Sequence, residues 1–228
     1  MTLLLASIVG PSFDDALRAV RRAIQNGADG VELRLDAMAD VTDEQVMMML
    51  AELPDDRHAM LTIRSREEGG HYDGLDADRV SRLIALGPLF DSIDVEAALW
   101  RRSANIRQKI MLAVERSAHE PPPLEQTDVA LAEPHAEMAE VSPAAPVPGR
   151  RLLILSHHDT RGRPPRLSAE LLDLVREPRC DIVKLAWAAR SLRECFEAFE
   201  LMRDRHKPLV AICMGDDGLI SRLLARKY

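Results

Sequence analysis

A single lysine, Lys184, interrupts an apolar stretch at residues 181–187. The apolar neighbours predict a buried strand, and a charged ammonium is costly to bury without a reason. In one interpretation, Lys184 lies near a strand end and reaches out to water. In the other, it is a buried amine that acts as a nucleophile. The rest of the chain has to decide between these two readings.

Histidine and carboxylate side chains supply further candidate chemistry. His157, His158 and Asp159 follow one another, which raises the question of a metal site. Neighbouring side chains on a strand point to opposite faces, so the two imidazoles cannot easily share one ion. We therefore expect no metal here, and we treat His158 as a candidate acid–base group.

The elements that must position these groups alternate regularly along the chain. Strands are predicted at residues 3–9, 31–36, 59–65, 92–96, 151–158, 181–187 and 209–214, and helices at 13–24, 42–53, 76–86, 99–116, 168–176, 191–205 and 219–228. Such strand–helix units imply parallel strands with right-handed crossovers. They fit either a (β/α)8 barrel or a doubly wound open sheet. No glycine-rich turn follows the first strand, which argues against a dinucleotide-binding fold.

A second periodicity favours the barrel. Apolar residues alternate with Glu32 and Arg34 in the second strand, with Arg64 in the third and with Asp94 in the fourth. One face of each strand is therefore polar, and a barrel interior lets these faces converge near the C-terminal strand ends. An alternative is a purely structural ion-pair network among these same charges, which leaves His158 unexplained.

Composition sets the outer limits. The chain has 228 residues, 46% of them hydrophobic, which suits one domain spanning residues 1–228. Residues 117–149 are rich in Pro, Ala and Glu without a steady period, and we interpret them as a flexible insertion. A net charge of −7, 4% aromatic residues and three cysteines without metal-type spacing predict a cytoplasmic protein that binds neither nucleic acid nor membrane.

Six segments together resemble the type I 3-dehydroquinate dehydratases of the shikimate pathway. They are Val-Glu-Leu-Arg-Leu-Asp at 31–36, Thr-Ile-Arg-Ser-Arg-Glu-Glu-Gly-Gly at 62–70, Ile-Asp-Val-Glu at 93–96, Ser-His-His-Asp at 156–159, Asp-Ile-Val-Lys at 181–184 and Met-Gly-Asp-Asp-Gly-Leu-Ile-Ser-Arg at 214–222. Each segment alone is weak, but six in the family's order are specific. The resemblance implies a (β/α)8 TIM barrel, commonly a homodimer, that uses no metal or cofactor.

The resemblance also implies roles for individual residues. Lys184 would form a Schiff base with the ketone of 3-dehydroquinate, and His158 would be the general acid–base, oriented by Glu68. Substrate-binding roles would fall to Ser7, Glu32, Arg34, Arg64 and Arg222. The product would be 3-dehydroshikimate.

The chemistry accounts for these residue types. A protonated imine on Lys184 acts as an electron sink when the weakly acidic α proton leaves, and His158 can take that proton and return it to the departing hydroxyl. The arginines suit an anionic substrate. Burial and the nearby Arg34 and Arg64 lead us to expect a lowered pKa for Lys184, because both disfavour its charged form.

The pattern is one unit short of a closed barrel. Seven strands are predicted, and the eighth βα unit is missing after the helix that starts at residue 219. The sequence leaves open a fragment of a longer chain, such as a fusion with shikimate dehydrogenase, and pairing with a second chain. Two other functions also stay open: a degenerate barrel that binds a carboxylate ligand or partner without turnover, and a class I aldolase-type lyase.

Overall fold

The computed structural model describes residues 2–38, 40–115 and 150–228. Within these ranges, seven strands form one parallel sheet whose spatial order is their order in the chain. The strands are β1 (Leu5–Ile8), β2 (Gly30–Arg34), β3 (His58–Thr62), β4 (Ser92–Glu96), β5 (Leu152–Asp159), β6 (Ile182–Ala188) and β7 (Leu209–Met214).

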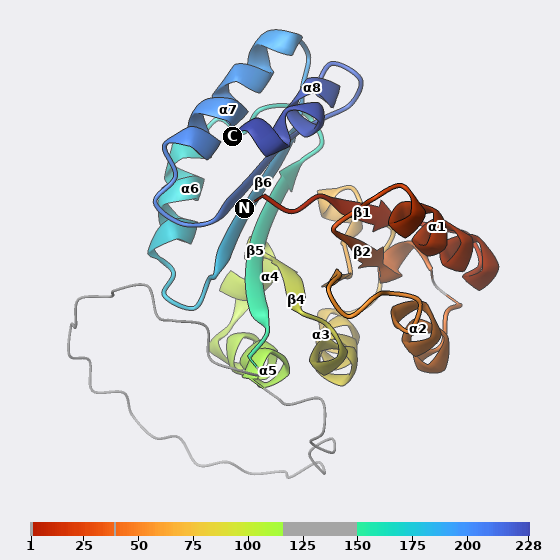
Figure 1. Cartoon of the computed structure of the whole chain (residues 1–228). Helices are drawn as coiled ribbons and strands as arrows, with labels where there is room; N and C mark the ends of the chain where they lie inside the picture. Colours follow the sequence, from red (N-terminus) through yellow and green to blue (C-terminus); the bar gives the residue numbers. More distant parts are fainter. Residues whose placement is uncertain (1, 39, 116–149) are drawn as a thin grey trace.

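The sheet curls, and the helices lie along its outer side (Figure 1). They are α1 (Phe13–Gln25), α2 (Asp43–Leu50), α3 (Asp76–Leu86), α4 (Ala97–Arg102), α5 (Ala104–Glu115), α6 (Leu167–Arg176), α7 (Cys195–Arg203) and α8 (Leu219–Leu223). Among the described residues, β1 pairs only with β2 and β7 only with β6, so the curled sheet does not close. The predicted barrel class is confirmed, with seven of its eight strands in the described residues.

Local sequence signals account for where several helices begin and end. The Ser12 hydroxyl accepts a hydrogen bond from the backbone N–H of Asp15, and Thr42 and Gln45 form a reciprocal capping box. Gly27 follows α1 with a φ of +82°, a conformation that glycine adopts at little cost. These two helices start where the capping residues predict.

Three predicted helices differ from those observed. The helix predicted at 219–228 ends at Leu223 in α8, and a 3-10 turn at Ala225–Lys227 follows it. The pattern at 99–116 is divided into α4 and α5, because Ser103 is extended and its hydroxyl accepts the N–H of Ile106, which starts a new helix. The helix predicted from residue 191 begins at Cys195, after a short 3-10 turn at Leu192–Glu194. None of these three differences moves a strand.

The alternation of strand faces is confirmed. Val31, Leu33 and Ile93 are fully buried in the core between sheet and helices. Glu32 and Asp94 lie on the other side of the same strands. There Glu32 accepts a hydrogen bond from Thr62, and Asp94 accepts one from Lys184. The polar face is therefore the concave side of the curled sheet.

Two sequence predictions receive no test from the fold. The interpretation of residues 117–149 as a flexible insertion lies outside the described residues, and a single-domain organisation stays a prediction. In the described part of the chain, no helix combines the length and apolar character needed to span a membrane.

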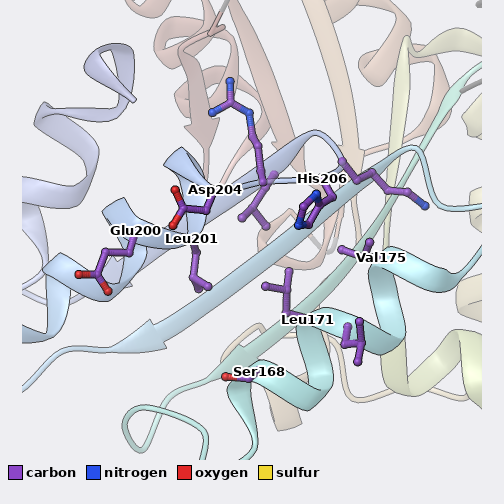
Figure 2. A pocket seen from close by; sticks show the side chains of 11 residues that line it. Ser168, Leu171, Val175, Glu200, Leu201, Asp204 and His206 are labelled. Carbon is purple, nitrogen blue, oxygen red and sulfur yellow. The ribbon is translucent and has the colours of Figure 1, made fainter.

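A shallow groove of about 430 Å³ runs between α6 and α7 on the outer side of the sheet (Figure 2). Leu171, Val175 and Leu201 form its apolar wall, and His206 lies at one end. Its lining comes from two helices, the loop between α7 and β7 and the start of β7, whereas the polar residues of the strands lie on the concave side. The groove is therefore separate from the candidate site.

Candidate functional site

Lys184 lies in the middle of β6 with only 6% of its surface exposed. Its Nζ donates to Asp94 Oδ2 on β4 at 2.7 Å and to Glu32 Oε1 on β2 at 3.0 Å. Glu32 is held in turn by the hydroxyl of Thr62, which donates to Oε1 at 2.8 Å. The lysine thus crosses the concave side of the sheet and does not reach out to bulk water.

The charge of Lys184 differs from the sequence-based expectation. Burial does disfavour the ammonium, but the negative charges of Asp94 and Glu32 outweigh it and raise the pKa of Lys184 above its usual value. The expectation of a lowered pKa was wrong for the ligand-free protein, because the sequence indicated the nearby arginines but not which carboxylates contact the amine. Lys184 therefore starts as a paired ammonium.

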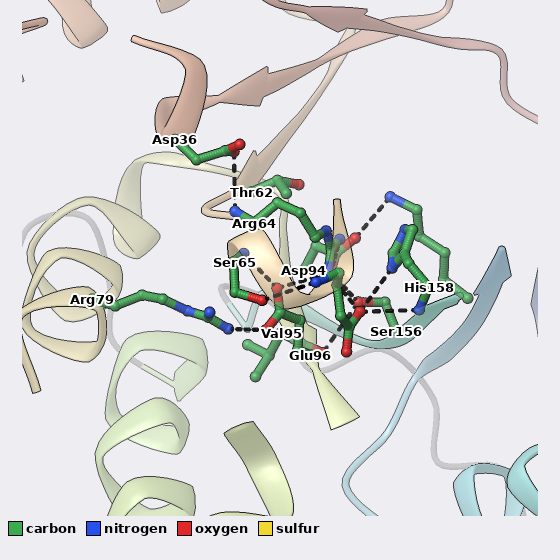
Figure 3. Close-up of polar contacts among 12 residues, drawn as sticks. Asp36, Thr62, Arg64, Ser65, Arg79, Asp94, Val95, Glu96, Ser156 and His158 are labelled. Carbon is green, nitrogen blue, oxygen red and sulfur yellow. Dashed lines mark hydrogen bonds and ion pairs between the residues drawn. The ribbon is translucent and has the colours of Figure 1, made fainter. Parts of the chain in front are cut away.

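Arg64, just after β3, links the carboxylates of the concave side. It is 2% exposed; Nη2 donates to Asp94 Oδ1 at 2.9 Å, and Nη1 donates to the hydroxyl of Ser156 at 2.9 Å. Nη1 also lies 3.5 Å from Glu68 Oε2 and 3.4 Å from Glu96 Oε1. These contacts raise the pKa of Arg64 further despite its burial. Figure 3 shows Arg64 and Asp94 at the centre of this cluster.

His158 and Glu68 form a buried pair beside Arg64. Glu68 Oε2 lies 3.0 Å from Nδ1 of His158 and accepts the backbone N–H of the same residue at 3.0 Å. Glu68 belongs to a 3-10 turn, Arg66–Glu68, that Ser65 caps by accepting the N–H of Glu68. One carboxylate oxygen thus fixes both the ring and the backbone of His158.

Ionisation in this pair is strongly perturbed. Burial, followed by the positive charges of Arg64 and Lys184, lowers the pKa of His158 to about 2. Burial, followed by the negative charge of Glu96, raises the pKa of Glu68 to about 8. The two groups interact directly, so they titrate as one unit that holds one proton near neutral pH. That unit can release a proton or, once deprotonated, accept one.

Lys184 and His158 are neighbours through the sheet. Lys184 lies opposite Ser156 in the β5–β6 register, and His158 is two residues further along the same face of β5. The structure therefore brings together three predicted catalytic residues from three elements: Lys184 from β6, His158 from β5 and Glu68 from the 3-10 turn after β3.

The predicted binding residues separate into two groups. Glu32 and Arg64 lie within the cluster, and Arg34 borders it, held by two hydrogen bonds of 2.7–2.8 Å to Asp36. Ser7 and Arg222 are exposed at the two edges of the sheet: Ser7 on β1 lies beside Glu32 in register, and Arg222 lies on α8. The guanidinium of Arg222 donates to the backbone carbonyl of Cys213 at 3.0 Å. A neutral carbonyl does not compensate this positive charge, and Arg222 forms no ion pair with a carboxylate of the described residues.

Several members of the cluster received no individual role from the sequence. Strand alternation places Ser156 on the same polar face as His158, and in the structure its hydroxyl donates to Asp94 Oδ1 at 2.6 Å. Asp36 accepts the backbone N–H groups of Arg64 and His71 and so anchors the loop after β3. Arg79 on α3 gave no signal, because a single arginine in an amphipathic helix is normally exposed.

The alternative of an ion-pair network is also realised. Asp94, with its pKa lowered by Arg64 and Lys184 despite burial, joins the two cations. The network and the His158–Glu68 pair occupy the same concave surface, so a structural ion-pair network and a catalytic site are compatible here.

A curled parallel βα sheet that carries a buried lysine beside a histidine–carboxylate pair is a βα-barrel with the side chains for imine and proton-transfer chemistry. The sequence profile of the family described as Type I 3-dehydroquinase matches residues 4–120 and 124–228, and the chain belongs to this family. The predicted family and its enzyme class, a hydro-lyase, are confirmed by this match.

Individual relatives agree. The chain is 22% identical over 227 residues to a 3-dehydroquinate dehydratase of Methanopyrus kandleri, covering 98% of this chain and 84% of the relative. It is 25% identical over 235 residues to the chloroplastic bifunctional 3-dehydroquinate dehydratase/shikimate dehydrogenase of Arabidopsis thaliana, covering all of this chain but 32% of the relative. In fold, it is similar to a type I 3-dehydroquinate dehydratase of Clostridium difficile solved with covalently modified comenic acid, with a TM-score of 0.70, 19% identity and coverage of 98% and 79%.

Proposed function

We propose that this chain dehydrates 3-dehydroquinate to 3-dehydroshikimate through a Schiff base on Lys184. The observation that carries the proposal is the buried amine of Lys184 beside the His158–Glu68 pair on one concave surface. Family membership supplies the substrate class, a small cyclic hydroxy-ketone acid.

The neutral amine of Lys184 adds to the ketone, and loss of water gives a protonated imine. Attack requires Lys184 first to give up the proton that Asp94 and Glu32 stabilise. The same two carboxylates then stabilise the positive charge of the imine, which the reaction needs as an electron sink. The two carboxylates therefore hinder deprotonation of the amine but favour the step that breaks the carbon–hydrogen bond.

His158 moves the proton. Once the pair has lost its shared proton, Glu68 is ionised and accepts the N–H of Nδ1, so Nε2 of His158 is free to take the α proton and leave an enamine. The imidazolium then returns this proton to the β hydroxyl, which departs as water, and hydrolysis of the imine releases the product. Net loss is one water molecule.

We assign binding of the substrate carboxylate to Arg222 and, at the border of the cluster, Arg34. Arg222 is exposed and contacts only a neutral carbonyl in the hydrogen bond described above, so its charge is available to an anion. Arg64 is enclosed by carboxylates, and its contact with substrate, like those of Ser7 and Glu32, stays a prediction.

The test replaces the amine. Lys184→Met is expected to abolish the absorbance of the conjugated product and borohydride trapping of the substrate, because it removes the amine that lies beside the His158–Glu68 pair. Lys207→Met is the matched control, since its amine donates to the carbonyl of Glu177 between α6 and β6. A Lys184→Met protein that traps substrate at full stoichiometry would refute the assignment.

A barrel that binds a carboxylate without turnover is a second candidate, favoured by the charged resting state of Lys184 and the unclosed sheet. Folded wild-type protein that binds 3-dehydroquinate in calorimetry but forms neither product nor trapped adduct would support it. Trapping without dehydration would favour the aldolase-type alternative. A homodimer, fusion to or pairing with another shikimate-pathway domain, and a cytoplasmic location stay predictions; the Arabidopsis relative is itself bifunctional.

A further inference from the structure

Arg79 is a buried arginine on α3 that none of the assigned roles uses. It is 2% exposed and lies among the apolar residues Val80 and Leu83, which face the core. Burial of a guanidinium is costly unless a well-placed partner compensates it. Its Nη2 donates to Glu96 Oε2 at 2.7 Å, and the pair is almost fully enclosed.

Glu96, the last residue of β4, carries the contact onward. Its second oxygen, Oε1, accepts the backbone N–H of Ser65 at 2.7 Å and lies 3.4 Å from Nη1 of Arg64. Figure 3 shows Arg79 reaching Glu96 from one side of the cluster, with His158 on the other. One carboxylate thus joins a helix outside the sheet to the loop that follows β3.

That loop holds the carboxylate that orients His158. Ser65 caps the 3-10 turn Arg66–Glu68 through its hydroxyl, and Glu68 then contacts both the ring and the backbone of His158. Two residues separate the anchored N–H of Ser65 from Glu68. A shift of Ser65 is therefore transmitted directly to the oxygen that meets Nδ1.

We propose that Arg79 is a positioning residue: by holding Glu96 against the backbone of Ser65, it fixes Glu68 on His158 and sets the charge that this pair experiences. The consequence for catalysis rests on the proposed function, whereas the link from Arg79 to the pair rests on the contacts above.

The charges that face the pair give the direction of the effect. Three charged residues face Glu68: Arg64, which follows β3, and Asp94 and Glu96, which belong to β4. His158, on β5, faces Arg64 and Asp94, together with Lys184 from β6 and Arg34 from β2. Removal of Arg79 leaves Arg64 as the one cation that pairs with the negative charge of Glu96 among the described residues. Arg64 also pairs with Glu68 and Asp94. The pair should then hold its proton to higher pH.

The experiment follows the ring of His158 by NMR in histidine-labelled protein, with His158→Asn used to assign its signal. In Arg79→Gln we expect the titration of the His158–Glu68 pair to move up by about 0.5–1 pH unit, the size of a nearby charge effect across a partly screened distance. Arg79→Lys should titrate like the wild type, because the lysine keeps a positive charge at this position. The same shift should appear in the pH dependence of kcat/KM, while the stoichiometry of borohydride trapping on Lys184 stays unchanged.

Arg82→Gln is the matched control on the same helix. Arg82 donates to the carbonyl of Val41 and does not contact the cluster, so its loss should leave the titration in place. A wild-type titration in Arg79→Gln, or an equal shift in Arg82→Gln, would overturn the proposal.

A double variant covers the case in which Arg79→Gln does not fold. Arg79→Met with Glu96→Gln removes both charges, yet keeps an amide oxygen for the N–H of Ser65. Because Glu96 raises the pKa of Glu68, we expect the opposite shift, to lower pH. An unmoved titration would reject the link. The NMR titrations need no turnover, so a wild-type protein that forms no product would refute the proposed function and leave the role of Arg79 to be judged by the titration.

Discussion

At the scale of single residues, Asp94 has two opposing effects on the reaction. It is the largest favourable influence on the ammonium of Lys184, and it would also stabilise the imine. We predict that Asp94→Asn lowers the pKa of Lys184, so that borohydride trapping extends to lower pH than in the wild type. Turnover should fall, because the imine loses its closest carboxylate.

The measurement is trapped adduct against pH, read by mass spectrometry beside product absorbance. Asp91→Asn is a suitable control, since Asp91 accepts the backbone N–H of Ala59 at the start of the strands. Trapping that shifts to higher pH in Asp94→Asn would contradict the assigned balance of charges.

The His158–Glu68 pair makes a prediction about stability. Between the unfolded pKa of glutamate and the folded value of about 8, the folded protein holds a proton on Glu68 that the unfolded chain has lost. Stability therefore falls as pH rises through this window. His158 has the opposite sign: its folded pKa of about 2 makes stability rise with pH up to its unfolded value near 6.5. The two effects cancel at mildly acidic pH, and only the loss caused by Glu68 is left above about pH 6.5.

Glu68→Gln should remove that loss. Urea unfolding at about pH 6.5 and pH 8.5 should show the wild type losing about 2 kcal/mol relative to Glu68→Gln between the two values. The comparison within each pH cancels contributions from other groups. Parallel stability curves for the two proteins would mean that Glu68 is ionised throughout this range.

At the scale of elements, the loop from Ser65 to Tyr72 has little room for a backbone change. A Cβ added to Gly70 would lie 2.2 Å from the carbonyl oxygen of Arg64, so the loop would have to move. We predict that Gly70→Ala costs about 1–3 kcal/mol, as overpacking does, and lowers turnover through misplacement of Glu68.

Gly27→Ala is the control for the loss of stability that a glycine-to-alanine substitution causes without a clash in this loop. Gly27 has a φ of +82° but open space around its Cβ position, so its substitution should cost about 1 kcal/mol and leave turnover unchanged. Urea unfolding gives the stability of each variant, and product absorbance gives its turnover. Equal turnover in the two variants would show that the loop tolerates the shift.

The elements also show what a sequence can and cannot predict. Alternation in β2, β4 and β5 placed Glu32, Asp94 and His158 on one surface, because side-chain direction in a strand depends only on local geometry. The pairing of Lys184 with Asp94 spans 90 residues, and no local rule fixes it. The break at Ser103 was missed because one serine within an apolar period is as compatible with a continuous helix as with a cap.

At the scale of the whole molecule, the unclosed sheet predicts a gradient of protection. Among the described residues, β1 and β7 each have one hydrogen-bonded neighbour, whereas β4 lies between β3 and β5 and is buried along its whole length. Edge strands present backbone groups to solvent and open at lower cost. We predict that amides of β1 and β7 exchange with deuterium at least about a hundredfold faster than those of β4, which corresponds to about 2.7 kcal/mol in local stability.

Peptide-resolved exchange at two protein concentrations provides the test and reaches the predicted dimer as well. Slow exchange in β1 and β7 that is independent of concentration would contradict the open edge, because the strands would then be paired within one chain. Protection that rises with concentration at these edges alone would mean that copies of the chain meet there and shield the backbone groups beside Ser7 and Met214. Sedimentation at the same concentrations would give the size of that assembly.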